Sequence, residues 1–356
     1  SQDVSLKVFT IQPTVSWAIT PRLSVGAGAM ISWGTVNLNK GLVSAETFDK
    51  ALPLLQQLDP RLSAVEPLGT TTPASVNLNG KSDVTVGLNV GALYKINDRV
   101  NVGASFRTRM AMKVDAGVAS VKYANRGVEA ALGETLNLID QANFRAQMPC
   151  PWVLGLGVSW KPVDRLTLAF DGRLTGWHTY KQLNVEFLAE QLRDYDQHIP
   201  KHYRNSWCFS VGGQYAVTNR FDARLGLMVD TTPVDRNFYN PETPGMTKIE
   251  PTVGLSFRPI GNLSIDVAFM YVHGCGGKDT SCSYPDLMGK AVIGNLTKVY
   301  TLGAMGQGMP ADQALLFGQN QAMQTAGAMG ISTEGTFSAR YTVRALIPSI
   351  GISYSF

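Results

Sequence analysis

The chain has 356 residues, of which 44% are hydrophobic and 16% charged, and its formal net charge is +4 at pH 7. This hydrophobic content excludes a disordered chain, and the mild, dispersed positive charge argues against a nucleic-acid-binding protein. No run of about 18 or more apolar residues occurs, which excludes a membrane-spanning helix.

Apolar residues alternate with small or polar residues along almost the whole chain, which predicts an all-β protein. The eleven predicted strands cover residues 4–19, 22–36, 81–97, 99–116, 142–161, 165–178, 203–218, 220–233, 246–259, 263–273 and 336–356. Tight turns alternate with the long connections 37–80, 117–141, 179–202, 234–245 and 274–335. This sorting of short turns from long loops is typical of a transmembrane antiparallel β-barrel of the bacterial outer membrane.

Each predicted strand has one apolar and one polar face. In strand 99–116 the alternation assigns Met110 to the lipid face, and Arg107, Arg109 and Lys113 to the lumen. Charged residues at such positions would be unfavourable in the core of a soluble protein, whereas they can pair with one another inside a wet lumen. The pattern therefore favours a wall between lipid and a polar interior.

The last strand supports the same interpretation, because Tyr354 and Phe356 share a face with Ile350 and Ile352. Ending the chain on such a strand is usual for outer-membrane barrels, and the strand must then run toward the periplasm. Single-chain bacterial barrels have an even number of strands. We therefore expect an odd number of strands, and a signal peptide, to be absent upstream of residue 1.

Pro149 and Pro151 flank Cys150 near the outer end of strand 142–161. Neither proline can donate a hydrogen bond to a neighbouring strand, so they predict a bulge or a strand edge. The alternative is a lateral opening in the wall.

Several segments, in chain order, resemble the long-chain fatty acid transporter family (FadL type). They are Leu78-Asn79-Gly80 with Phe106-Arg107-Thr108, residues 174–183 (LTGWHTYKQL), residues 224–234 (RLGLMVDTTPV) and residues 264–274 (SIDVAFMYVHG). The resemblance implies a 14-stranded barrel of which this chain holds the last eleven strands, as a single domain over 1–356. The N-terminal hatch and the kinked third strand of that family would be missing, and the loop insertion 275–335 departs from it.

The resemblance also implies the function: passive uptake of long-chain fatty acids or similar hydrophobic compounds across the outer membrane, surrounded by outer-membrane lipids and lipopolysaccharide. No cofactor, metal, nucleic-acid partner or enzymatic reaction is expected. The main rival is a barrel of the same family that serves as a scaffold or shuttle for a protein secretion apparatus and binds a protein partner through its loops. An outer-membrane hydrolase is a third possibility.

Apolar residues with helical spacing occur in the long loops, which predicts short helices there. Ser44 is placed to cap a helix that carries Phe48, Leu52 and Leu55 on one face, and residues 315–317 form a similar cluster. These residues are candidates for capturing an alkyl chain. The alternative is that such faces only pack on the rim of the barrel.

Four arginines are candidates for binding a carboxylate in the lumen, because a charge-assisted hydrogen bond would fix the head group. They are Arg107, Arg109, Arg173 and Arg224. The alternative is that they pair with lumenal aspartates in structural networks.

Cys275 and Cys282 frame a Gly-rich loop, and a disulfide between them suits an oxidising compartment, with two free thiols as the alternative. His198 and His202 have the spacing of two metal ligands on a helix, but Pro200 lies between them and breaks such a helix. We therefore predict surface residues there, with metal binding and catalysis as alternatives.

Overall fold

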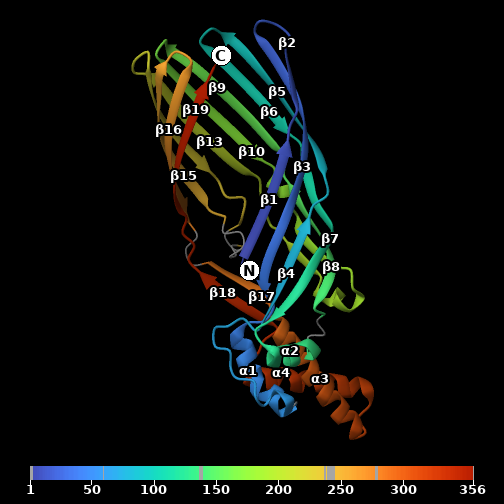
Figure 1. Cartoon of the computed structure of the whole chain (residues 1–356). Coiled ribbons are helices and arrows are strands. Elements are labelled where there is room, and N and C mark those ends of the chain that lie inside the picture. Colours follow the sequence, from blue (N-terminus) through green and yellow to red (C-terminus); the bar gives the residue numbers. More distant parts are fainter. Residues whose placement is uncertain are drawn as a thin grey trace.

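A computed structural model describes residues 3–58, 60–135, 139–235, 238, 245–276 and 280–355. Phe356, which was predicted to share a face with Tyr354, lies outside the described residues. Seventeen of the nineteen strands form one sheet, and β17 and β18 form a separate hairpin. The sheet curves, with tight turns and the C-terminus at one end and α-helices beyond the other (Figure 1). The expectation of a mostly β protein is confirmed.

The strands of the main sheet are β1 (Asp3–Ile11), β2 (Thr14–Ala18), β3 (Leu23–Gly41), β4 (Ala74–Lys81), β5 (Thr85–Asn97), β6 (Val100–Arg107), β7 (Met110–Tyr123), β8 (Gln141–Cys150), β9 (Val153–Val163), β10 (Leu166–Thr175), β11 (Gln182–Phe187), β12 (Gln197–Pro200), β13 (Ser206–Ala216), β14 (Phe221–Asp230), β15 (Thr247–Ile260), β16 (Leu263–Cys275) and β19 (Arg344–Tyr354). The separate hairpin consists of β17 (Thr280–Pro285) and β18 (Glu334–Ala339). The helices are α1 (Ala45–Leu58), α2 (Arg126–Thr135), α3 (Leu287–Gly306) and α4 (Ala311–Ala328), with 3₁₀ turns η1 (Pro60–Leu62), η2 (Trp177–Thr179) and η3 (Glu190–Tyr195).

Several strands of the wall are interrupted along their length. β1 and β2 pair with successive parts of β3 on one side, and β4 and β5 do so on the other. Next to them, β6 and β7 pair with β5 and β4, and β9 and β8 pair in turn with β6 and β7. Short interruptions lie at residues 12–13, 82–84, 108–109 and 151–152. The last of these begins at Pro151, so the prolines mark a local break between β8 and β9; neither strand is an edge of the sheet, because each has neighbours on both sides.

Beyond the interruptions the sheet continues through segments that were expected to be loops. The expected connection 37–80 contains β4, 117–141 contains the end of β7, and 179–202 contains β11 and β12. The expected strand 336–356 is two strands in different sheets, β18 and β19.

The outer face of the half-sheet nearest the turns is apolar and exposed. Leu225 is 70% exposed and Ile350 is 75% exposed, whereas Asp222, which points to the opposite face of the same strand as Leu225, is 2% exposed. An exposed apolar face opposite a polar face is typical of a strand that borders lipid. The facing predicted for strand 220–233 is therefore confirmed.

The alternation shifts by one residue at the interruption between β6 and β7. Met110 is buried and accepts a hydrogen bond at Sδ from Ser32 Oγ (3.8 Å) on the inner face, so Lys113 points outward. The prediction that Met110 faces lipid and Lys113 the lumen was wrong. Thr108 absorbs the extra residue, since its backbone and its hydroxyl both bond Leu88 and hold the irregular segment in place.

The two edges of the sheet remain apart. β1 and β2 pair with β3, and β19 pairs with β16, but no strand pairing among the described residues joins these edges. The described residues thus form a curved, open wall and not a closed barrel, and the expectation that this wall is eleven strands of fourteen remains a prediction.

Four helices, α1 to α4, form a helical cap beyond the end of the sheet opposite the turns (Figure 1). Its apolar core joins Phe48 of α1, Val128 of α2, Met288 of α3 and Ala322 of α4. None of the described helices is long and apolar enough to cross a membrane. The cap is therefore a small core of its own, built from loops far apart in the sequence.

Two helix starts in the cap are tied together. Ser44 Oγ accepts a hydrogen bond from Thr47 N (3.0 Å), as expected for the residue that caps α1. Asp286 caps α3 by accepting from Gly289 N (3.0 Å), and its second oxygen accepts from Thr47 Oγ1 (2.7 Å). A single carboxylate thus links the starts of α1 and α3.

Candidate lumenal binding site

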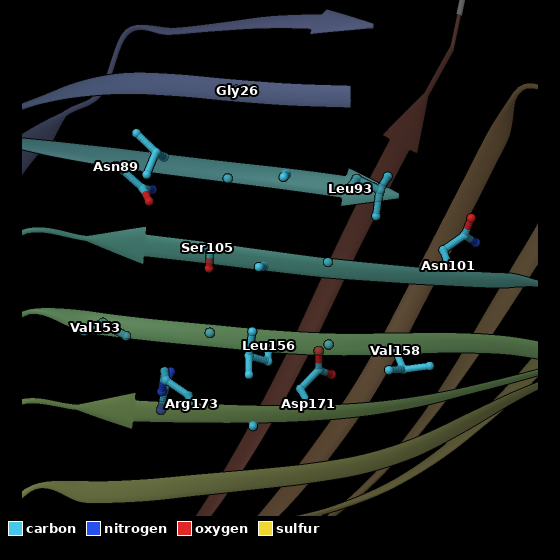
Figure 2. A pocket seen from close by; sticks show the side chains of 18 of the residues that line it. Gly26, Asn89, Leu93, Asn101, Ser105, Val153, Leu156, Val158, Asp171 and Arg173 are labelled. Carbon is cyan, nitrogen blue, oxygen red and sulfur yellow. The ribbon is translucent and has the colours of Figure 1, made fainter. Parts of the chain in front are cut away.

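The inner face of the half-sheet nearest the turns borders a hollow of about 890 Å3 (Figure 2). Its lining includes the small and polar side chains of Gln12, Ser16, Asn89, Asn101, Ser105, Asp171 and Arg173, together with aliphatic ones such as Leu93, Leu156 and Val158. Glycines lie among them, and the Asp171 carboxylate occupies the space that a Cβ atom at Gly157 would take. The sequence pattern that predicted a small, polar lumenal face is confirmed here.

Arg173 is the candidate arginine best placed for a ligand. It lies on β10 between Gly155 of β9 and Cys208 of β13, so its cross-strand neighbours are small. Its side chain lines the hollow, as Figure 2 shows, and is exposed. Within the described residues it forms no salt bridge, not even with Asp171 on the same strand. Arg173 is therefore a free cation in a largely uncharged wall.

Arg107 and Arg109 lie toward the cap from the hollow, and neither is among the residues that line it. Arg107 ends β6 beside Asn89 of β5, on the inner face, and Arg109 lies in the interruption before Met110. Neither forms a salt bridge in the part of the chain that the structure describes. Arg107 is thus a second cation within reach of the hollow, while the sequence register does not hold for Arg109.

Arg224, in contrast, is held by other side chains. Its Nη1 donates to Asp266 Oδ1 (3.0 Å) and its Nε to Gln214 Oε1 (3.0 Å). Asp266 also accepts hydrogen bonds from Ser256 and Ser264. The network expected as the alternative role of these arginines is present at Arg224, and this guanidinium has little capacity left for a ligand.

The same network includes a buried carboxylate. Asp222 accepts from Arg258 Nη2 (2.8 Å) and from Gln214 Nε2 (3.0 Å) and is 2% exposed. A buried charge is stable only when it is paired and hydrogen-bonded, and both conditions are met. The lumen near the turns is thus cross-linked by polar contacts between β13, β14, β15 and β16.

Between the hollow and the helical cap, the inner face becomes apolar. Val76 and Leu78 of β4, Val114 of β7, Phe144 of β8 and Val185 of β11 are all buried in one cluster. We call it the inner apolar cluster. It lies between the helical cap and the polar hollow, so a solute moving from one to the other along the wall passes it.

The structure places Phe48, Leu52 and Leu55 inside the cap, where they are 0%, 3% and 8% exposed. This arrangement is the packing alternative considered from the sequence. Their role in ligand binding remains a prediction that requires the cap to open.

The exposed apolar surface of the cap lies instead on α3 and α4. Leu302 of α3 is 68% exposed, and on α4 the side chains of Leu315, Leu316, Phe317 and Met323 are exposed as well. α4 packs on α3 through small residues such as Gly318 and through a hydrogen bond between Tyr300 Oη and Thr325 Oγ1 (2.9 Å). The large side chains of α4 are therefore free to meet an apolar ligand.

The loop residues singled out from the sequence form no site in the part of the chain described. Cys275 and Cys282 are free thiols here, so the disulfide remains a prediction, and burial raises the pKa of the Cys282 thiol. His198 Nδ1 contacts Asn184 Oδ1 (3.1 Å), and His202 stacks on Phe238. Among the described residues no group of three potential metal ligands occurs.

Sequence reasoning missed the inner apolar cluster. Its signal was present, because Val76, Leu78 and Gly80 alternate with Asn77 and Asn79. This alternation lies in a segment that was assigned to a loop. Its apolar residues point inward, whereas those of β5 point outward.

A sequence profile of the family described as "Outer membrane protein transport protein (OMPP1/FadL/TodX)" matches residues 1–310. Outer membrane protein P1 of Haemophilus influenzae is 20% identical over 273 residues, which are 76% of this chain and 56% of the relative. The long-chain fatty acid transport protein of Escherichia coli is 21% identical over 213 residues, covering 58% of this chain and 46% of the relative. The chain thus spans about half the length of these curated relatives.

Solved structures show the same fold. The crystal structure of a Pseudomonas aeruginosa FadL homologue superposes with a TM-score of 0.63 at 22% identity, over 80% of this chain and 63% of the other. The resemblance deduced from the strand motifs is confirmed, and so is the outer membrane as the location of the protein. The chain belongs to the outer membrane protein transport protein family (OMPP1/FadL/TodX).

Proposed function

We propose that the protein conducts long-chain fatty acids or similar hydrophobic molecules passively across the outer membrane. The curved sheet is then most of a barrel wall, formed by the last eleven of fourteen strands. Further strands close it between β1 and β19, because a membrane leaves no strand edge unpaired. The turns face the periplasm, and the cap with the insertion 275–335 faces the outside.

In this proposal a hydrophobic molecule first contacts the exposed apolar side chains of α3 and α4. It then passes the inner apolar cluster around Phe144 and reaches the hollow. Burial of the tail contributes about 0.8 kcal/mol per CH2 group. An acidic head group can bind Arg173, with Arg107 as a second cation nearby.

One observation carries the proposal: an arginine without a salt bridge among the described residues lines a hollow of about 890 Å3, and a buried apolar cluster lies on the same inner face toward the cap. This sequence of apolar and cationic surfaces suits an amphiphile with a long tail and an anionic end. The name of the Escherichia coli relative, a long-chain fatty acid transport protein, supports the same class of ligand.

The test is mass spectrometry of lipids that co-purify with the detergent-solubilised full-length protein, followed by titration with a fluorescent C16 fatty acid. We expect a defined acyl ligand that unlabelled palmitate displaces with saturation. A full-length protein that carries no acyl ligand and shows no saturable binding would overturn the proposal.

A further inference from the structure

The outer face of the sheet changes from apolar to polar along single strands. On β3 the outward positions are Ile31 and Trp33 up to the level of Gly34, and Asn37 and Asn39 beyond it. β3 runs through this level without a break, so the side chains change their chemistry while the backbone continues. A lipid-facing strand that simply ended here would not need this change.

On the neighbouring strands β1 and β4, the outward-facing side chains also become polar at the level of Gly34. Lys7 pairs with Thr35, and the next outward residue of β1, Phe9, pairs with Trp33 and stacks on it at 6.2 Å. On the other side of β3, Lys81 of β4 pairs with the same Thr35. The change is therefore a line across several strands rather than a feature of one.

The inner face changes in the opposite sense. Where Asn77 and Asn79 point outward, Val76 and Leu78 point inward and belong to the inner apolar cluster. A sheet that is polar outside and apolar inside is arranged for water around it, whereas one with an apolar outer face is arranged for lipid. The line where the two arrangements meet follows the interruption at residues 82–84.

We propose that this line is the outer surface of the membrane and that Lys7, Lys81 and Lys113 bind phosphate groups of the outer-leaflet glycolipid, lipopolysaccharide. The inference goes beyond transport. It uses the outer-membrane location together with the orientation given above.

The three lysines form a row just beyond the apolar band. Lys7 and Lys81 flank Thr35, which places them about 10 Å apart across β3. The backbone carbonyl of Lys113 accepts from Asp83 N (2.8 Å), so Lys113 lies beside the interruption that follows Lys81. A row of cations that continues directly from a lipid-facing surface matches the place of a phosphorylated head group.

The side chains of these lysines are available. All three are exposed, and within the described residues none forms a salt bridge. Two carboxylates, Asp83 and Asp115, are close along the chain, and they too lack an ion pair in the described part of the molecule. Lysine is a compact point charge that suits phosphate, and charge complementarity therefore favours a phosphorylated lipid over a neutral one.

The test uses the full-length protein in detergent and compares it with the variant Lys7→Gln/Lys81→Gln/Lys113→Gln. Binding of purified bis-phosphorylated lipid A is measured by native mass spectrometry and by titration. We expect the triple variant to bind lipid A roughly 100-fold more weakly, at about fivefold per lysine. Dephosphorylated lipid A should bind both proteins equally weakly, and inorganic phosphate alone should not compete at millimolar concentration.

The matched control replaces three exposed lysines of the cap side, Lys122, Lys290 and Lys298, by Gln, with the same loss of charge. This variant should bind lipid A like the wild type. Both variants must keep the heat-dependent gel mobility of a folded barrel. Equal lipid A binding by the boundary variant and the wild type would overturn the proposal, as would equal binding of dephosphorylated lipid A by the wild type. Fatty acid binding is measured separately, so failure of the transport proposal is distinguishable.

Discussion

Arg173 offers the most direct test of how the lumen recognises a head group. Replacing it by Gln removes the cation and keeps a polar side chain of similar reach. Its cross-strand neighbours are Gly155 and Cys208, and it forms no salt bridge in the described part of the chain, so the substitution breaks no internal contact. The fold and the hollow should remain intact.

The size of the effect follows from the chemistry of the lost contact. A hydrogen bond to a charged group contributes about 1.5–3 kcal/mol. Arg173→Gln should therefore raise the Kd of a fatty acid by roughly 10- to 150-fold. A fatty alcohol of the same chain length has the same tail but no carboxylate, so its Kd should stay within about twofold.

The assay is a displacement titration of both ligands against wild type, Arg173→Gln and Arg224→Gln. Arg224→Gln is the matched control, because it removes the same charge from the lumen but from a guanidinium already held by Asp266 and Gln214. It should change acid binding little. If Arg173→Gln weakens acid and alcohol equally, or weakens neither, the assignment of the head-group site to Arg173 is wrong.

Four further results are expected. Arg258→Ala should lower the free energy of unfolding by about 3 kcal/mol in urea titrations, because it leaves the buried charge of Asp222 with only Gln214 as a partner, and the exposed Arg220→Ala should change it by less than about 0.5 kcal/mol. Asp286→Ala should speed amide hydrogen exchange in both α1 and α3, at a cost of about 1–2 kcal/mol, whereas an effect on α3 alone would contradict the shared link. Phe144→Ala should cost about 3–5 kcal/mol by opening a cavity in the inner apolar cluster, and a neutral result would show that the cluster is loosely packed. In reduced protein Cys282 should react with a maleimide more slowly than a surface thiol at pH 8, because its raised pKa leaves less thiolate, and thiol counting without reductant decides whether it bonds Cys275.

The strands of the sheet were predictable because apolar and polar residues alternate along them with a period of two. Asp222 and Arg224 alternate with Leu225 and Leu227, and this period of two reports the two faces of a strand whatever lies beyond them. The polar lumen, the lipid face and the family resemblance all depend on that signal. They were accordingly predicted from the sequence alone.

The strands of the cap-side part of the sheet could not be predicted from this alternation. At Val36 and Asn37 the apolar residues move from the outer to the inner face of β3. The lipid-facing alternation therefore stops there, and the predicted strand ended at residue 36. At residues 108–109 the phase shifts by one residue, which misplaces Met110 and Lys113. Both errors have the same cause: the outer face of a strand changes from apolar to polar along its length. The alternation of residues alone does not show at which residue this change occurs.

Long-range contacts explain the rest. Phe48 has the spacing expected of a surface that captures ligand and of a face that packs on other helices, and only the positions of α2 and α3 decide between them. Asp286 meets Thr47 across 239 residues of sequence, a distance over which no local pattern carries information. Arg224 is held by Asp266 and Gln214, whereas Arg173 forms no salt bridge among the described residues. This difference could not be predicted from the sequence, because it depends on side chains from other strands.

The membrane line proposed along β1, β3 and β4 would also set how deep the protein sits. Strands rise about 3.3 Å per residue, so a displacement of two residues moves the wall by about 7 Å. Toward the periplasm, that movement brings Lys7, Lys81 and Lys113 into the edge of the hydrocarbon, where the cost of a lysine rises from about 0–1 kcal/mol with depth. In the other direction it carries Phe9 and Trp33 into water. With the proposed line at the membrane surface, a shift in either direction is unfavourable, so we expect a thinner or thicker membrane to deform around the wall.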